Sequence, residues 1–263
     1  MKRKKEKQIA ISEQKKSSNT QNPNSTFLSI VIPLYNEENS IANVIRNIPY
    51  RKSQEIIVVN DGSTDKSVMN AKKLNDKNVR IIHHPQNLGY GAALLTGIKL
   101  AKGDIIVTLD SDGQHDPKEI PNIINPIIKG ETDIVVGSRY MGTCHYTVPL
   151  HTRMGEYVID KVLWVLFGQP IKNNQSGYRA FNKDVKEIVE KSRFKGMGFT
   201  TELLFKSGIR NFKFREVPIE VSERSYGTSY VYLPKLIISI LILITYYSFL
   251  NIVDKIYRSI FKK

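Results

Sequence analysis

The chain has 263 residues, 41% of them hydrophobic, which is enough for one large α/β domain with tails. Its single cysteine, Cys144, excludes an internal disulfide and a cysteine-rich zinc site. The formal net charge is +14, but residues 1–26 carry seven lysines and arginines against two acids, and residues 254–263 carry four against one. The tails therefore hold over half of the excess charge. A nucleic-acid-binding module needs a basic stripe across its folded domain, so nucleic acid is excluded as the expected partner.

The N-terminal segment, residues 1–26, is rich in Lys, Ser, Asn and Gln and poor in apolar side chains, which predicts a disordered basic tail. No apolar run follows its first basic cluster, so it lacks the pattern of a signal peptide. An anionic membrane surface suits such a tail, and a solvated tail without a partner is the alternative. We expect the globular domain at residues 27–232 and a separate C-terminal region at 233–263.

From Phe27 onward, buried strands alternate with turns and helices. The predicted strands are Leu28–Ile32, Glu55–Val59, the start of segment 79–103, Ile105–Leu109, and part of segment 131–140. Helices are predicted to begin near Glu37, after a cap at residues 63–65, and near Gly89. This alternation predicts an α/β fold, with a mostly parallel sheet, helices on both faces, and a binding site at the carboxyl ends of the strands.

The segment Gly103–Pro117 carries the strongest chemical signal. Its buried strand ends in Asp110 and Asp112, which alternation points the same way. Two adjacent carboxylates favour a hard cation, Mg²⁺ or Mn²⁺, whose remaining ligands are water and substrate phosphates, so the pattern predicts a diphosphate-bearing substrate. The alternative is an acidic turn that caps the next helix, a role expected of Asp116 before Pro117.

The C-terminal region begins with an uncharged run, Leu236–Val253, whose 18 residues would span about 27 Å as a helix, the short limit for crossing a bilayer. Apolar residues then continue at helical spacing, with Lys255 and Arg258 elsewhere on the wheel. We expect a hydrophobic, membrane-associated helix with a basic amphipathic end. A core helix is the alternative, and spanning or lying in the interface is left open. Lys255 on the far side would oppose the positive-inside rule, which favours attachment at the cytoplasmic face.

Several motifs occur together in one order: IPLYNEE, VVNDGSTD, NLGYGAALLTGI, LDSDGQHDP, GSRY, QSGYRAF and RSYGTS. With this set the chain resembles the family 2 glycosyltransferases of the GT-A fold over residues 27–232. It looks closest to the branch that includes dolichol-phosphate mannosyltransferases and polyprenyl-phosphate glucosyltransferases.

The resemblance implies roles for residues at matching positions. For nucleotide-sugar binding these are Pro33, Tyr35, Glu37, Asp61 and Asp110. For the metal they are Asp110, Asp112 and Gln114, and for the acceptor phosphate Arg139, Arg179, Arg224 and Ser229. Asp112, Arg139 and Arg179 are the implied catalytic residues, and Glu202 corresponds to a position near the acceptor site. Without the resemblance, each arginine would be read as a surface ion pair.

The implied reaction is inverting transfer of a hexose from GDP-mannose or UDP-glucose to a polyprenyl phosphate. Such an acceptor needs no general base, because a phosphate monoester is already ionised at neutral pH. The alternative is transfer to a glycan or another hydroxyl acceptor. The partners expected are the donor, the lipid phosphate and the membrane, and a homo-oligomer is left open.

Two departures weaken the acceptor assignment. Asn173 and Asn174 stand where relatives usually have an acid, and Tyr230 where they have a lysine. Segment Thr152–Gly168 is predicted as an amphipathic helix, whose apolar face we assign to core packing rather than to lipid.

Overall fold

The computed structural model describes residues 26–224 and 233–261, and its centre is a seven-stranded sheet with strand order β3-β2-β1-β4-β6-β5-β7. The strands are β1 Leu28–Leu34, β2 Gln54–Asn60, β3 Val79–His83, β4 Ile105–Thr108, β5 Ile134–Cys144, β6 Arg179–Asn182 and β7 Phe214–Val221. Only β6 runs antiparallel to its neighbours, β4 and β5. The mostly parallel α/β sheet is therefore confirmed.

Strand β6 has a position that the motif QSGYRAF did not predict. Arg179 is the first residue of β6, opposite Thr108 of β4 and Val136 of β5. A four-residue strand carries no periodic signal of its own, so its place depends on pairing with two distant strands. Because β6 is antiparallel to β4, Arg179 at its start lies beside Thr108 at the end of β4, at the edge of the sheet where the site is expected.

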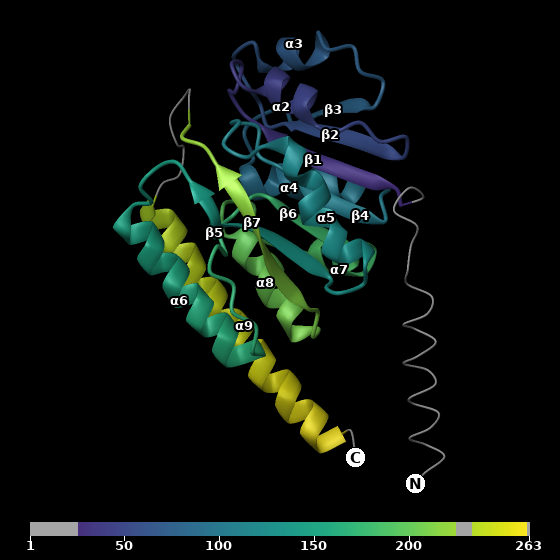
Figure 1. Cartoon of the computed structure of the whole chain (residues 1–263). Coiled ribbons are helices and arrows are strands. Elements are labelled where there is room, and N and C mark those ends of the chain that lie inside the picture. The colour runs from purple at the N-terminus through teal and green to yellow at the C-terminus, as the bar shows by residue number, and fades with distance from the viewer. Residues whose placement is uncertain (1–25, 225–232, 262–263) are drawn as a thin grey trace, which may run out of the picture.

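Helices cover both faces of the sheet, as predicted (Figure 1). They are α2 Ile41–Asn47, α3 Ser67–Lys72, α4 Tyr90–Leu100, the 3₁₀ turn η1 Pro117–Glu119, α5 Ile120–Ile128, α6 Leu150–Phe167, α7 Lys183–Val189, α8 Phe199–Ile209 and α9 Leu233–Phe261. Alternation along β1 sends Ile30 and Ile32 into the core shared with α2 and α5, and Val31 into the core shared with α4 and α8. The sheet is thus buried on both faces, so a ligand can reach it only at an edge.

Helix α2 begins at Ile41, four residues later than predicted. The intervening residues form a turn in which Asn36 has φ +53°, and the amides of Asn36 and Glu37 donate to the hydroxyls of Ser63 and Ser67. The loops after β1 and β2 therefore bind each other, and this fixes the first two strand ends in relation to one another.

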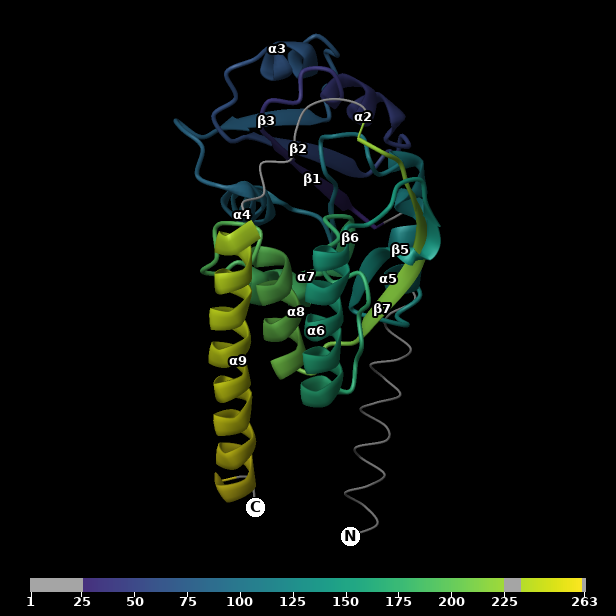
Figure 2. The ribbon, with the colours of Figure 1, turned by 90° about the vertical axis from the view of Figure 1, so that its left-hand side faces the viewer.

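The C-terminal region is one continuous helix, α9, rather than two (Figure 2). It packs against α8 and α6 and buries Leu243 and Tyr247. Within residues 26–224 and 233–261, no helix is both long and apolar enough to cross a membrane. The predicted disorder of residues 1–25 and the predicted role of Ser229 concern positions outside the described residues.

Candidate active site

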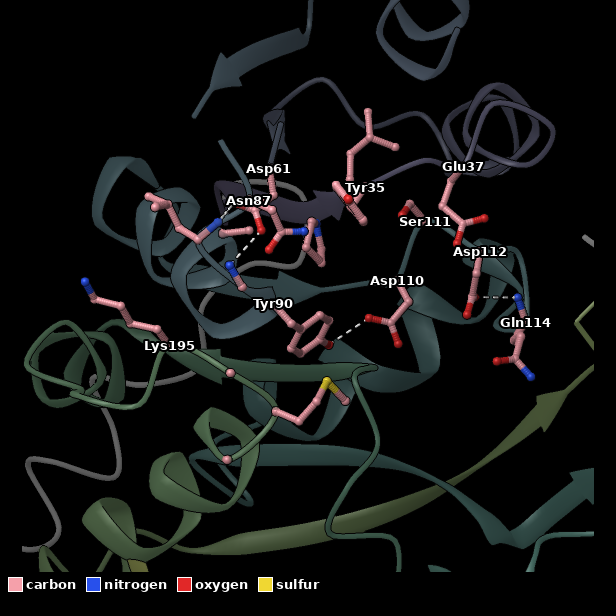
Figure 3. Close-up of a pocket in the computed structure, with 18 of the residues that line it drawn as sticks. Tyr35, Glu37, Asp61, Asn87, Tyr90, Asp110, Ser111, Asp112, Gln114 and Lys195 are labelled. Carbon is pink, nitrogen blue, oxygen red and sulfur yellow. Dashed lines mark hydrogen bonds between the residues drawn. The ribbon is translucent and has the colours of Figure 1, made fainter. Parts of the chain in front are cut away.

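A cavity of 1540 Å³ opens at the carboxyl ends of the strands (Figure 3). Its lining comes from the segments that follow β1 to β4, from the loop before α6, from residues 193–198, and from the segment after β7. This is the edge that the alternation of strands and helices predicts for a binding site. Segments far apart in the sequence therefore meet around one space.

The four residues expected to bind the nucleoside, Pro33, Tyr35, Glu37 and Asp61, all line this cavity. Asp61 is buried and accepts hydrogen bonds from the amides of Leu88 at 2.9 Å and Gly89 at 2.8 Å. These contacts bind the segment before α4 to the end of β2. They also fix the carboxylate, so a ligand meets it in one orientation.

His84 supports Asp61 from behind. Its Nδ1 lies 2.7 Å from the Asp61 carboxylate, and its Nε2 lies 2.9 Å from the hydroxyl of Thr96 on α4. Both ring nitrogens are thereby occupied, so His84 has a supporting role.

Glu37 forms an ion pair with Arg224, which comes from the segment after β7. The two residues are 187 positions apart, and both line the cavity. The contact joins the first strand end to the last across the cavity. Arg224 was predicted to meet the acceptor phosphate, and the ion pair places it at the nucleoside side as well.

Asp110 and Asp112 leave the end of β4 and line the floor of the cavity (Figure 3). Tyr90, from the start of α4, donates its hydroxyl to Asp110 Oδ1 at 2.7 Å. Asp112 Oδ1 accepts from the amide of Gln114 at 3.0 Å, while the Gln114 side chain donates to the Ser222 carbonyl. Tyr90 was not anticipated from the sequence, although its place between two glycines at a helix start was a usable signal.

The electrostatics of these carboxylates fit a divalent cation. Burial, and after it the charge of Asp110, raises the pKa of Asp112 to about 6, and burial also raises the pKa of Asp110. Within the described part of the chain, no group of three or more His, Cys, Asp or Glu side chains forms a complete metal site. An ion held here would need further ligands from phosphate and water, as Mg²⁺ commonly does.

His115 lies beside this pair, with Nδ1 3.7 Å from Asp110 Oδ2. Among the contacts of the described residues this nitrogen has no hydrogen-bond partner, although it is buried. Burial lowers the pKa of His115 to about 4, so the ring is neutral at pH 7 and retains a lone pair. A neutral imidazole carries one N–H donor and one lone pair, so this nitrogen either points a proton toward Asp110 or accepts from a ligand.

The glycine of the QSGYRAF motif lies directly behind Asp110. A Cβ atom at Gly177 would fall 2.2 Å from Asp110 Oδ2, so only glycine leaves room for the carboxylate. The Gly177 carbonyl accepts from the hydroxyl of Thr108 at 2.6 Å, which holds the backbone in place.

Arg179 braces the same turn. Its guanidinium donates to the carbonyls of Ser176 at 2.7 Å, Thr200 at 2.6 Å and Asn174 at 2.5 Å, and its side chain is buried. Burial lowers its pKa to about 10, so it stays charged at neutral pH. Among the described residues that line the cavity, Arg179 is not one. Three of the five N–H groups of its side chain are bound to backbone carbonyls, and its role at the acceptor phosphate stays a prediction.

Arg139 is also set back from the cavity. Its Nη2 donates to both carboxylate oxygens of Glu156 on α6 at 2.9 Å, and Tyr140 donates to the same carboxylate at 2.5 Å. Its other terminal nitrogen donates to the hydroxyl of Tyr146, which does line the cavity. Arg139 is thus one contact removed from a ligand, and its ion pair is largely buried rather than on the surface.

Comparison with known proteins decides the family. The model of the family described as glycosyl transferase family 2 matches residues 29–189, more than half of the chain. The chain belongs to glycosyltransferase family 2. The predicted family resemblance is confirmed.

Two named relatives act on dolichyl phosphates. The transferase is 34% identical over 220 residues to UDP-N-acetylglucosamine--dolichyl-phosphate N-acetylglucosaminyltransferase of Methanococcus voltae, a match that covers 76% of this chain and 88% of that protein. It is 32% identical over 210 residues to dolichol-phosphate mannosyltransferase of Pyrococcus furiosus, covering 77% and 58%.

Solved structures share the GT-A fold of this transferase. Glucosyl-3-phosphoglycerate synthase from Mycobacterium tuberculosis, in complex with Mn²⁺, UDP-glucose and phosphoglyceric acid, superposes with a TM-score of 0.66 at 21% identity. The match covers 85% of this chain and 80% of that one. Other structures of that synthase contain Mn²⁺ or Mg²⁺ with UDP.

The loop at residues 193–198 forms another wall of the transferase cavity and contributes Arg193 and Lys195 to it. Glu202 of α8 lies beneath this loop, fully buried, and accepts from the amides of Arg193 at 3.0 Å and Phe194 at 2.9 Å. Tyr247 of α9 donates its hydroxyl to the same carboxylate at 2.7 Å. Glu202 therefore connects the C-terminal helix to a wall of the cavity. No local pattern in the sequence predicts that Lys195 lines the cavity.

Proposed function

We propose that this family 2 transferase moves a hexose from a nucleotide sugar to a polyprenyl phosphate of dolichyl type, with inversion at the anomeric carbon. The observation that carries the proposal is the meeting of the Asp110–Asp112 pair with the nucleoside-side residues in one cavity. The dolichyl-phosphate relatives support the acceptor. GDP-mannose and UDP-glucose are the donors inferred from the sequence, and the Methanococcus relative adds UDP-N-acetylglucosamine.

Asp110 and Asp112, with Gln114 beside them, would hold Mg²⁺ or Mn²⁺. When bound, the ion supplies positive charge for the leaving nucleoside diphosphate. Tyr90 and Gly177 keep Asp110 in the orientation this requires, through the hydroxyl contact and the close backbone approach.

The remaining donor contacts come from the first two strand ends. Pro33 and Tyr35 border the base, and Glu37 and Asp61 accept hydrogen bonds from it or from the ribose. Both carboxylates are buried and oriented before a ligand arrives, by Arg224 and by the amides before α4. Preorganised acceptors lose little freedom on binding, which favours affinity.

In the transfer, an oxygen of the acceptor phosphate forms a bond to the anomeric carbon while the bond from that carbon to the donor diphosphate breaks. No general base is needed, so catalysis consists of positioning and charge stabilisation. Arg224 and Ser229 remain the proposed contacts to the acceptor phosphate. Arg139 and Arg179 act as positioning residues, through Tyr146 and through the turn that carries Gly177.

The acceptor is a lipid, so the proposal includes attachment at the cytoplasmic face of a membrane. Residues 27–232 would form the catalytic domain, and residues 233–263 would provide contact with the bilayer. The basic tails are suited to anionic headgroups.

The test is transfer of radiolabelled sugar from GDP-mannose, UDP-glucose or UDP-N-acetylglucosamine into organic-extractable product, with purified full-length protein, dolichyl phosphate and Mg²⁺. One donor should give a signal that a chelator removes. Asp110→Asn should abolish it, because a metal ligand is lost. Asp116→Asn is the matched control, because Asp116 caps η1 and asparagine caps equally well.

Two outcomes would contradict the proposal. An active, chelator-sensitive Asp110→Asn protein would refute the metal assignment. Nucleotide and metal binding without any lipid product, together with transfer to a sugar hydroxyl, would favour the hydroxyl-acceptor alternative.

A further inference from the structure

Helix α6 exposes a large apolar surface. It buries two acids, Glu156 and Asp160, together with Ile159 and Leu163. Its exposed side carries His151, Arg153 and Lys161 and also six large apolar side chains that are 50% to 70% exposed: Leu150, Met154, Tyr157, Val158, Trp164 and Val165. Our assignment of this helix to core packing was therefore wrong for Tyr157, Val158 and Val165. Large apolar side chains gathered on one exposed face of a helix fit an apolar environment better than water.

The outward face of α9 continues the same surface. Ile238, Ile242 and Phe249 are 57% to 63% exposed, whereas Leu243 and Tyr247 are buried against the domain. Helices α6 and α9 contact each other and lie on the same side of the molecule (Figure 2). We call these outward apolar faces of α6 and α9 the two-helix face.

The two-helix face begins at the mouth of the cavity. Pro149, directly before α6, and Ser239, in the first turns of α9, both line the cavity. Both helices then run away from it (Figures 1 and 2). An acceptor whose phosphate occupies the cavity would thus find an apolar path for its chain along these helices.

Charge identifies the occupant. The chain carries a net charge of +14, and the sequence directly beyond the described side chains of α9 adds Lys255, Arg258, Lys262 and Lys263. Two copies of so basic a chain repel each other, whereas an anionic bilayer attracts the chain. The side chains agree: Tyr157 and Trp164 suit the interface, and Lys161, 5.0 Å from the Tyr157 ring, can extend its ammonium to headgroups.

We propose that the two-helix face docks on an anionic lipid bilayer, with α6 contacting lipid alongside α9. The part that concerns the acceptor chain rests on the proposed function, and the docking itself does not. Docking by two helices would hold the cavity mouth at the membrane surface, where a lipid-linked phosphate is presented.

The chain carries its own probe for this proposal. Trp164 is the only tryptophan, and it is exposed in the last turn of α6. Full-length protein is mixed with vesicles of phosphatidylcholine and phosphatidylglycerol, and the emission of Trp164 is recorded. Docking predicts a blue shift and quenching by brominated lipid. If the vesicles sediment the protein while Trp164 emission is unchanged, the tails or α9 alone make contact and the proposal is overturned.

A matched pair of variants separates this face from the rest of the surface. Met154→Glu places a charge in the α6 face and should lower vesicle partitioning about tenfold or more. Met69→Glu makes the same change at an exposed methionine of α3, distant from α6, and should leave partitioning unchanged (Figure 1). Equal partitioning of the two variants would overturn the proposal. So would a blue shift that depends on protein concentration without lipid, since that indicates a second copy as the occupant.

Failure of the docking and failure of the proposed function are distinguishable. Vesicle binding needs neither donor nor acceptor, so quenching of Trp164 without any lipid-linked product would keep the docking and reject the reaction. If the protein transfers sugar to dolichyl phosphate in detergent but the emission of Trp164 does not change with vesicles, the reaction is kept and the docking is rejected.

Discussion

Gly177→Ala tests whether the position of the Asp110 carboxylate determines activity. The new Cβ would lie 2.2 Å from Asp110 Oδ2, whereas ordinary contacts begin at 3.4 Å. The backbone cannot retreat, because Thr108 and Arg179 hold it through the carbonyls of Gly177 and Ser176. The carboxylate must therefore move by roughly 1 Å, and a displacement of that size in a reacting site costs on the order of 100-fold in rate.

The assay measures metal-dependent nucleotide binding and sugar transfer for Gly177→Ala, together with thermal unfolding. We expect a melting temperature close to that of the parent, since a side-chain rotation is enough to relieve the overlap. Gly155→Ala in α6 is the control, because nothing lies within 4 Å of the added methyl group. Its activity should be unchanged and its stability higher by up to about 1 kcal/mol.

The reasoning is refuted if Gly177→Ala binds metal and nucleotide as the parent does and transfers sugar at the same rate. A large loss of stability would also refute it, because the backbone rather than Asp110 would then have yielded.

Three further predictions follow from the same site. Tyr90→Phe removes the hydroxyl that Asp110 accepts, and we expect a loss of about 1–2 kcal/mol, or 5- to 30-fold, in metal–nucleotide affinity by calorimetry; unchanged affinity would contradict this role. Metal–nucleotide binding should weaken as the pH falls through about 6, because Asp112, with its pKa raised to about 6, must lose a proton to bind a cation. Without metal, the raised pKa of Asp112 makes the folded protein lose stability as the pH rises from the ordinary carboxyl range through about 6. If neither the metal–nucleotide affinity nor the stability changes with pH in this range, the raised pKa of Asp112 is contradicted. Glu202→Gln should cost about 2–3 kcal/mol in unfolding free energy by leaving amides of the 193–198 loop poorly paired, and Tyr247→Phe should cost less; equal, negligible losses would show that the contact is unimportant.

The sequence predicted the parts of the fold that local pattern determines. The apolar run of β1 is buried on both faces, and the polar residues that follow β1, β2 and β4 line the cavity. This works because parallel strands present their carboxyl ends at one edge, so short stretches of sequence suffice to locate a site. Asp116 also caps η1 as predicted, by accepting from the amide of Lys118 at 3.0 Å.

Features that depend on distant partners were beyond such reasoning. Strand β6 is four residues long and is defined by pairing with β4 and β5. The contact of Glu202 with Tyr247 joins residues 45 positions apart, and that of Arg224 with Glu37 joins residues 187 apart. The sequence pattern around one residue of such a pair does not indicate which distant residue it contacts.

Helix α6 shows a different limit. Its apolar spacing predicts an amphipathic helix correctly, but spacing alone does not say which side faces the domain. The domain presents Arg139 and the amide of Asn174 to this helix, so the buried side is the one with Glu156. Polar partners in the interior thus bury Glu156 together with Ile159 and Leu163, and several large apolar side chains are left outward.

The motif arginines show why a motif alone does not separate contact from support. Arg139 reaches the cavity through Tyr146, and Arg179 reaches Asp110 through the turn at Ser176 and Gly177. Substituting Arg139 or Arg179 would disturb the site as much as removing a residue that binds the ligand directly. An arginine in a motif can therefore serve either to contact the ligand or to support the residues that do. What separates them is whether the donors are already occupied. For Arg179, three of the five N–H groups are bound to carbonyls, which makes it a brace for the turn behind Asp110.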